Sequence, residues 1–129
     1  MDRRGALRVA EVSTLKRGMV IDVNLDPTRG SETGKIRPCA IVTNDTYNAR
    51  VPVIQVVPLT AWSHRKAGIV TNVEIDPSPL NGLSKRSIAD CLQTRPVDHR
   101  LRFVRVRGEL EEGAMAAINA ALKIVFDLK

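Results

Sequence analysis

Short stretches of β-prone residues, each closed by proline or glycine, constrain the fold of this 129-residue chain more than any other feature. Apolar residues alternate with polar ones from Met19 to Leu25, which predicts a strand with one buried face, and Asp26-Pro27 ends it. Further strands are predicted at residues 36–43, 53–60, 69–76, 88–92 and 101–106. The pattern therefore indicates a mainly β protein.

The C-terminal segment after Gly108 has a different period. Its apolar residues recur at steps of three and four positions, at Met115, Ile118, Leu122 and Val125. Glu111 and Glu112 stand at the start of this segment and Lys123 near its end, where their charges complement a helix dipole. Together with five or six strands, this amphipathic helix predicts a small antiparallel sheet or barrel packed on one helix.

The chain has the length of one domain, and no repeat or linker divides it. Residues 1–14 show no sustained period, so we expect an N-terminal tail there and the domain at 15–129. No apolar run reaches membrane length and no signal peptide is recognisable, which favours a cytoplasmic protein with no membrane contact.

Lysine and arginine number 20 against 14 acidic residues, a net charge of +6 that attracts polyanions. Nucleic acid is therefore the first candidate partner, although many small proteins are basic without binding anything. Aromatic residues make up only 3% of the chain, which argues against a surface that stacks many bases.

The two cysteines, Cys39 and Cys91, are far apart and have no C-x-x-C spacing, so we expect buried thiols. His64 and His99 add no metal-ligand spacing. Neither a metal site nor a cofactor is predicted.

One segment carries a specific series of motifs. From Lys16 to Asp45 the chain reads R-G, a strand, D-P-T, G-S-E and G-K-x-R-P, followed by an apolar strand and N-D. This series resembles the opening of the MazF/PemK toxin family. V-P-L-T-A at 57–61 resembles the family's second block, and G-L-S-K-R-S at 82–87 with Q-T-R-P-V-D at 93–98 more weakly resembles a third. The resemblance spans roughly residues 15–128.

The resemblance implies an SH3-like or CcdB-like barrel with a C-terminal helix, working as a homodimer whose interface forms an RNA groove. It implies a toxin that cleaves single-stranded RNA without a metal. The 2′-hydroxyl attacks the adjacent phosphate and leaves 2′,3′-cyclic phosphate and 5′-hydroxyl ends. A cognate antitoxin with a flexible acidic segment would occupy the groove, and DNA would be contacted only indirectly, through the antitoxin.

Three residues are candidates for catalysis, and the first two match catalytic positions of the family. Arg37 matches the catalytic arginine, whose rigid guanidinium stabilises the extra charge of the phosphorane. Thr60 matches the catalytic threonine, with a positioning and charge-stabilising hydroxyl. Glu32, the only carboxylate in the polar stretch from Thr28 to Lys35, is a candidate proton acceptor or base contact.

Four further residues are predicted to bind RNA: Arg29, Ser31, Lys35 and Gln93. Arg29 and Lys35 flank Glu32 and would hold phosphates, a contact that weakens with salt. A second group of arginines could extend this surface, although a solvated strand face is the preferred interpretation: Arg95, Arg100, Arg102, Arg105 and Arg107.

The chain departs from the family pattern at two places. Met19 and Asp22 replace an acidic residue and an aromatic found in many relatives, so we expect altered packing in the first strand. Leu92 stands where some PemK-type members carry an acidic residue, and Asp90 is the fallback for that role.

Two other functions stay open. CcdB-like toxins share the fold class and inhibit a topoisomerase without cleaving RNA, although the Arg37-Pro38 block argues against that interpretation. A catalytically inactive nucleic-acid-binding barrel would have the same basic charge.

Overall fold

The computed structural model describes residues 15–129, so the predicted tail at 1–14 lies outside the described residues. Its strands are β1 (Met19–Asn24), β2 (Ile36–Ile41), β3 (Val53–Ala61), β4 (Asn72–Ile75), β5 (Ser87–Asp90), β6 (Arg95–Asp98) and β7 (Phe103–Glu109). The helices are α2 (Asp45–Asn48), α3 (His64–Ala67), α4 (His99–Arg102) and α5 (Glu112–Val125), with a 3₁₀ turn η1 (Cys91–Gln93).

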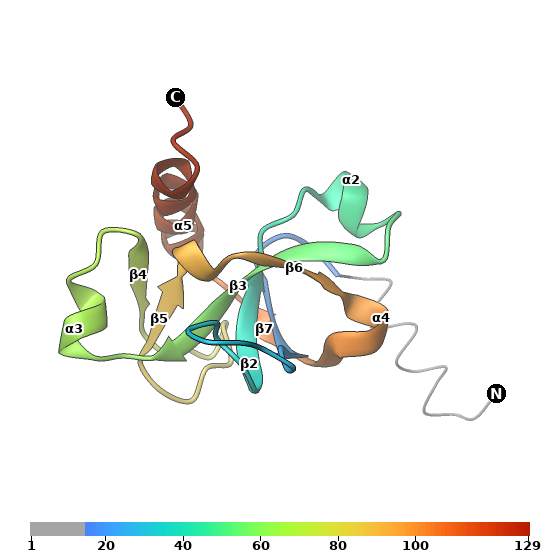
Figure 1. Ribbon diagram of the computed structural model, residues 1–129, viewed down its shortest axis with the longest axis horizontal. Helices are drawn as coiled ribbons and strands as arrows, with labels where there is room; N and C mark the ends of the chain where they lie inside the picture. The colour runs from blue at the N-terminus through green and yellow to red at the C-terminus, as the bar shows by residue number, and fades with distance from the viewer. Residues whose placement is uncertain (1–14) are drawn as a thin grey trace.

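The strands pair antiparallel in the order β4-β5-β3-β2-β1-β7, and β6 pairs with β3 outside this path (Figure 1). The first part of β3 pairs with β6 and β2, whereas Leu59, Thr60 and Ala61 pair with β5. Thr60 thus lies just beyond the point where β3 changes neighbours. The mainly antiparallel sheet with a C-terminal helix is confirmed, and closure into an SH3-like barrel stays a prediction.

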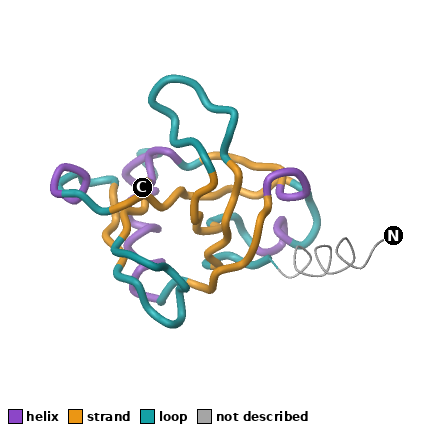
Figure 2. The backbone as a smooth tube through the Cα atoms, turned by 90° about the horizontal axis from the view of Figure 1, so that it is seen from below, coloured by secondary structure: helices purple, strands orange, loops and turns teal. Residues whose placement is uncertain are grey.

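Helix α5 forms as its apolar period predicts. Its buried residues Ile118 and Ala121 pack in one core cluster with Val20, Val57 and Leu59 of the sheet. A second cluster lies among β1, β2, β3 and β6 and includes Phe103 of β7. Seen from below, the strands occupy the middle of the molecule and the helices lie around them (Figure 2).

Strand β1 is buried on both faces, so the prediction of a half-buried strand was wrong. Val20 belongs to the cluster under α5, whereas Ile21 and Val23 belong to the second cluster. Asp22 is only 5% exposed. The reason is that β1 lies between β2 and β7, with one core cluster on each side.

Other predicted strands have different bounds, and the one predicted at 36–43 ends at Ile41. The strand predicted at 69–76 begins only at Asn72, because a turn follows α3 in which the Ile69 amide donates to the Lys66 carbonyl (3.2 Å). The strand predicted at 88–92 ends at Asp90, where η1 begins. The strand predicted at 101–106 begins at Phe103, because α4 occupies the residues before it.

Strand β6 was missed in the sequence. Its four residues include Pro96 and two charged residues, and only Val97 is buried, so no alternation is visible. The strand forms because β3 offers it a partner edge. Pro38 lies inside β2, but in the half of that strand that β3 does not pair, because β3 joins only from Cys39 onwards.

Both cysteines are free and buried, as predicted. Burial, and secondarily the charge of Asp22, raises the pKa of the Cys39 thiol far above its usual range. Burial, and then the charge of Asp90, raises the pKa of Cys91 to about 11. Both thiols are therefore protonated at neutral pH. Within residues 15–129, no helix is long and apolar enough to cross a membrane.

Candidate functional site

The loop between β1 and β2, residues 25–35, is closed at its base by the Leu25 amide, which donates to the Lys35 carbonyl (2.9 Å). Gly34 sits where a Cβ would come within 2.6 Å of both Asp26 Oδ1 and Thr28 Oγ1. Only glycine fits there without displacing those side chains. The two ends of the loop, which carry the D-P-T and G-K motifs, therefore pack against each other.

Glu32 organises the tip of this loop. Its Oε1 accepts a hydrogen bond from the Arg29 amide (2.6 Å), and its own amide donates to the Arg29 carbonyl (3.1 Å). One carboxylate oxygen is thereby engaged. Arg29, Ser31 and Lys35 are exposed around it, as residues that contact RNA must be. Lys35 adopts φ 67°, a left-handed conformation that costs a lysine free energy.

Gln93 braces the loop from outside. Its Nε2 donates to the Ser31 carbonyl (3.2 Å), and its Oε1 accepts from the Thr33 amide (3.3 Å). Both ends of the side-chain amide are therefore committed to the loop backbone. Its role in this structure is to position the loop, and direct contact with RNA stays a prediction.

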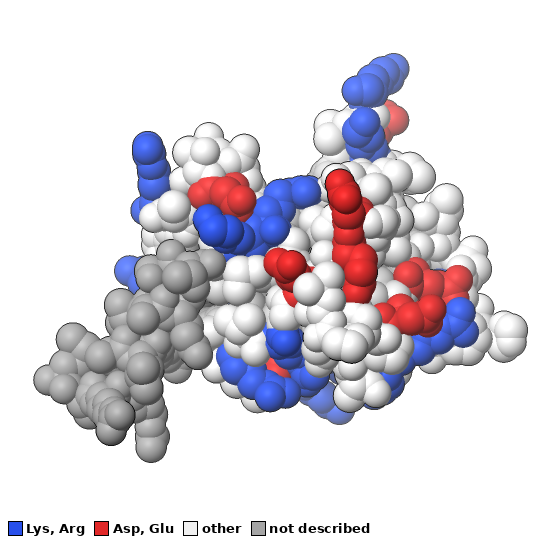
Figure 3. Space-filling model, turned by 180° about the vertical axis from the view of Figure 1, so that it is seen from behind, with Lys and Arg blue, Asp and Glu red and all other residues white. Residues whose placement is uncertain are grey.

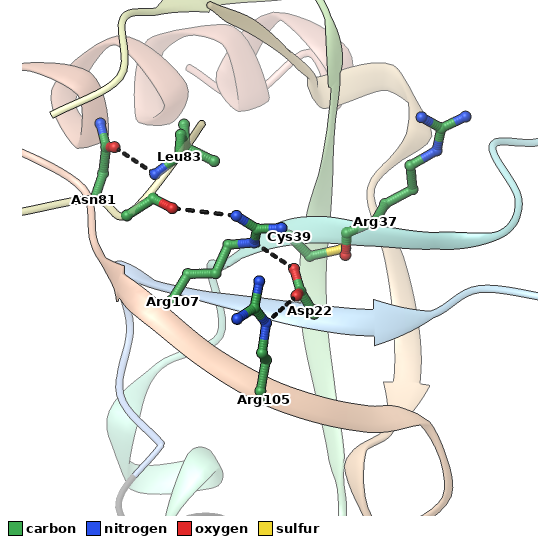
Figure 4. Close-up of polar contacts among 8 residues, drawn as sticks. Asp22, Arg37, Cys39, Asn81, Leu83, Arg105 and Arg107 are labelled. Carbon is green, nitrogen blue, oxygen red and sulfur yellow. Dashed lines mark hydrogen bonds and ion pairs between the residues drawn. The ribbon is translucent and has the colours of Figure 1, made fainter. Parts of the chain in front are cut away.

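Arg37 lies at the end of the same loop, on the second residue of β2. Its Nε donates to the Gly34 carbonyl (3.2 Å). Within residues 15–129 it forms no ion pair, so its two terminal amino groups are available to a ligand. Figure 4 shows the side chain extended away from Asp22 and the two arginines that surround that carboxylate.

Thr60 lies near the end of β3, the strand that pairs with β2 just after Arg37. Cys39 of β2 lies opposite Pro58 of β3 and is the last residue of β2 that β3 pairs, so Arg37 and Thr60 each lie two residues beyond that pair, where Thr60 pairs instead with Ile88 of β5. Residues two apart share a face of a strand, so both side chains stand on the face of Cys39 and Pro58. The structure thus places two of the three predicted catalytic residues beyond the same end of the β2–β3 pairing.

Lys66 is a site residue that the sequence interpretation missed. Its Nζ donates to Thr60 Oγ1 (3.3 Å) and to the Ala61 carbonyl (3.4 Å). Helix α3 folds this lysine back because the Ser63 side chain caps the helix by accepting from the Lys66 amide (3.2 Å). The serine cap was the one visible signal in the sequence.

The fallback residue Asp90 lies half-buried at the end of β5, where it pairs in register with Asn72. Within the described chain it forms no ion pair with any arginine or lysine. Leu92 is 67% exposed. His99 is buried in α4, whereas His64 is exposed on α3.

The arginines at 105 and 107 converge on one buried carboxylate. Arg105 Nε lies 2.7 Å from Asp22 Oδ2, and Arg107 Nε lies 2.6 Å from Asp22 Oδ1 (Figure 4). Arg107 also donates from Nη1 to the Gly82 carbonyl (3.2 Å). Asp22, at which altered packing was expected, is thus a buried carboxylate shared by two guanidinium groups.

Two other arginines brace the start of the β1–β2 loop. Arg95 donates to the Leu25 carbonyl (3.2 Å), and Arg102 donates to the carbonyls of Asn24 (3.0 Å) and Asp26 (2.5 Å). The preferred interpretation of this group as a solvated strand face was wrong for these residues. Their sequence pattern could not show it, because each partner is a backbone carbonyl at least 70 residues away.

Groups of three histidine, cysteine or acidic residues placed to hold a metal ion do not occur within residues 15–129. The chemistry available at the site is that of a guanidinium with free donors, a hydroxyl, an ammonium and the carboxylate of Glu32. Such a set can bind and polarise a phosphodiester.

Comparison with known proteins identifies the family of this chain. Residues 16–126 match the family described as PemK-like, MazF-like toxin of type II toxin-antitoxin system. The endoribonuclease MazF of Staphylococcus saprophyticus is 36% identical over 114 residues, which cover 88% of this chain and 92% of that protein.

Solved structures share the fold. MazF of Deinococcus radiodurans superposes with a TM-score of 0.75 at 23% identity, covering 88% of this chain and 97% of that one. A mycobacterial endoribonuclease in complex with its cognate antitoxin gives a TM-score of 0.71 at 22% identity, covering 90% and 98% of the two chains. On the family match and the staphylococcal relative, the chain belongs to the PemK-like, MazF-like toxins of type II toxin-antitoxin systems.

Proposed function

We propose that this chain is an endoribonuclease toxin that cleaves single-stranded RNA at short sequence motifs, with Arg37 and Thr60 at the scissile phosphate. One observation carries the proposal: Arg37 keeps its terminal amino groups free, and it lies beyond the same end of the β2–β3 pairing as Thr60. The name of the staphylococcal relative, endoribonuclease MazF, points to the same activity.

The reaction uses the substrate's own 2′-hydroxyl as nucleophile. Its oxygen forms a bond to phosphorus, the bond from phosphorus to the 5′-oxygen breaks, and the products carry 2′,3′-cyclic phosphate and 5′-hydroxyl ends. Glu32 accepts the proton of the 2′-hydroxyl with the carboxylate oxygen that the Arg29 amide leaves free. The leaving 5′-oxygen takes up a proton from water, and Glu32 gives its proton to the hydroxide that remains. No step requires a metal or a cofactor.

Charge stabilisation comes from Arg37 and Lys66. The guanidinium of Arg37 donates to the phosphorane oxygens as their negative charge grows. The Lys66 ammonium lies 3.3 Å from Thr60 Oγ1 and orients that hydroxyl so that its proton points toward the substrate. Thr60 then donates to a phosphate oxygen rather than acting as a base.

The β1–β2 loop binds the RNA on either side of the cut. Arg29 and Lys35 contact phosphates and Ser31 contributes a hydroxyl. Gln93 keeps the loop in place and also contacts the RNA through its side-chain amide. Because the charged groups of the loop are exposed, the phosphate contacts are screened by salt.

The toxin works as a homodimer of SH3-like barrels whose interface forms the RNA groove. One solved relative is bound to its cognate antitoxin, and we extend this partnership to the present chain. A flexible acidic segment of the antitoxin competes with RNA for the same basic groups, and DNA is reached only through the antitoxin.

Incubation of the protein with mixed-sequence single-stranded RNA in EDTA, followed by mapping of the ends, tests the proposal. We expect 2′,3′-cyclic phosphate products. Arg37→Ala should lower kcat by roughly 100- to 1000-fold, the usual cost of one lost donor to transition-state charge. Thr60→Val should slow cleavage at least about tenfold, since it keeps the shape of the residue and removes the hydroxyl.

Arg50→Ala is the matched control, because Arg50 is an exposed arginine in the turn after α2, and it should cleave like the wild type. Cleavage that requires added metal would contradict the mechanism. RNA that is bound but stays intact would instead indicate an inactive nucleic-acid-binding protein.

A further inference from the structure

The only tryptophan of the chain lies beside Thr60 in a stack of three side chains, Trp62, His64 and Arg86, which we call the Trp62 stack. The Arg86 guanidinium carbon lies 4.4 Å from the centroid of the Trp62 ring. The His64 ring packs on Trp62 with centroids 5.2 Å apart and a tilt of 57°. Cation, indole and imidazole therefore form one continuous surface.

The Trp62 stack is held in place by the protein itself. The indole Nε1 donates to Glu74 Oε1 (2.5 Å), and the Trp62 amide donates to the Arg86 carbonyl (3.2 Å). Arg86 in turn pairs with Glu74 (2.8 Å) and Asp76 (3.3 Å). A ligand that stacks here meets side chains that are already ordered, so little binding free energy is lost in ordering them.

The position of the stack relates it to the cut. Trp62 follows Thr60 by two residues, and its amide continues the pairing of β3 with the segment before β5. Two residues along a strand span about 7 Å on the same face. This distance is comparable with the reach from one phosphate to the base of a neighbouring nucleotide. Lys66, from the same α3 turn as His64, already contacts Thr60.

We propose that the Trp62 stack binds the nucleobase next to the scissile phosphate by stacking, with the exposed imidazole of His64 as its outer surface. The proposal rests on the endoribonuclease function proposed above and adds a base-binding site to it. Every base has a π face, so the site tolerates any base and favours purines, whose larger rings overlap more of the surface.

The low aromatic content agrees with one such site rather than many. The remaining aromatic side chains lie in other elements: Tyr47 in α2, Phe103 buried in β7 and Phe126 at the end of α5. Figure 1 shows α2 and α3 at opposite ends of the molecule, so Tyr47 provides a distant aromatic control.

Because Trp62 is the single tryptophan, its fluorescence reports on this site alone. The probe is a mixed-sequence RNA pool with 2′-O-methyl groups at every position, which cannot supply the nucleophile and stays intact. We expect the pool to quench Trp62 emission, with the same half-saturation as binding followed by the anisotropy of a labelled pool.

His64→Ala and Trp62→Leu should each weaken binding by about tenfold, within the usual range for one lost base stack. His64→Phe should restore most of the affinity, because it keeps an aromatic face, and Tyr47→Leu should bind like the wild type.

Unchanged Trp62 emission at RNA concentrations that saturate the anisotropy would overturn the proposal. So would wild-type affinity in both His64→Ala and Trp62→Leu. These failures would leave cleavage of unmodified RNA intact. If unmodified RNA were not cleaved while quenching persisted, the endoribonuclease function would fall and the base-binding site would stand.

Discussion

At the scale of single residues, Asp22 shows how a charge is accommodated inside this sheet. Its side chain is 7% exposed and receives one guanidinium on each carboxylate oxygen. Arg107 is largely buried with it, at 19% exposure, whereas the Arg105 side chain is 61% exposed. A buried carboxylate is tolerated when it is paired and hydrogen-bonded. The two arginines therefore make it possible for β1 to bury an aspartate.

Replacement of Asp22 by asparagine should therefore destabilise the protein. The Asp22→Asn change keeps the size of the side chain but leaves the guanidinium of Arg107 partly buried without a counter-charge, which should cost about 2–3 kcal/mol of unfolding free energy. Equilibrium unfolding in urea measures the change.

Arg105→Ala is the matched control, and it should cost less than about 1 kcal/mol because its ion pair is open to solvent on one side. Equal losses of unfolding free energy in Asp22→Asn and Arg105→Ala would show that the buried pair with Arg107 stabilises the protein no more than the exposed pair does.

At the scale of elements, the turn that follows helix α5 contains a residue that is unusual for its conformation. Asp127 adopts φ 53°, and the Leu128 amide reaches back to the Lys123 carbonyl (2.8 Å), the hydrogen bond of a Schellman ending. Glycine is the preferred residue at that place because it lacks the Cβ that crowds a left-handed backbone. An aspartate there also adds negative charge at the negative end of the helix dipole.

Asp127→Gly should therefore stabilise the protein by about 0.5–1 kcal/mol and raise the Tm by roughly 2–4 °C for a chain of this size. Thermal unfolding followed by circular dichroism at 222 nm measures the shift.

Asp127→Ala separates the two causes, since it removes the charge but keeps a Cβ. Its Tm should lie clearly below that of Asp127→Gly. A glycine variant no more stable than the alanine variant would show that the left-handed backbone costs nothing at this position.

At the scale of the whole molecule, the net charge of +6 is not spread as one positive surface. On the face seen from behind, basic and acidic side chains are interspersed (Figure 3). Four basic groups that form no ion pair within residues 15–129 lie at the site: Arg29, Lys35, Arg37 and Lys66. We expect these four groups, rather than the overall charge, to set the dependence of RNA binding on salt.

The KM for RNA should therefore rise steeply with salt, while kcat changes little. For single-stranded RNA, four phosphate contacts give a slope of about −3 for the logarithm of affinity against the logarithm of salt concentration. Cleavage assays between low and physiological salt measure this slope.

Lys35→Met removes one phosphate contact and should make the slope less steep by about 0.7. Arg50→Ala should leave the slope unchanged. A KM that does not respond to salt would contradict phosphate binding by these groups.

The sequence by itself determined those features that depend on neighbours along the chain. Period-two alternation located β1, and the three- and four-residue steps located α5, because each pattern matches the geometry of one element. The motifs that lead up to Arg37-Pro38 were recognisable as well. Gly34 packs on Asp26 and Thr28, and this packing requires a fixed spacing between the motifs of the loop. These local constraints were enough to indicate the family.

Only the tertiary structure decided which distant residues meet. The pairing of β3 with β2 places Thr60 and Arg37 beyond the same end of that strand pair, and the cap of α3 returns Lys66 to Thr60. Asp22 contacts its two arginines because β7 pairs with β1. The physical reason is that strand pairing joins residues from 12 to 90 positions apart, and no periodicity along the chain records which partner a strand will find.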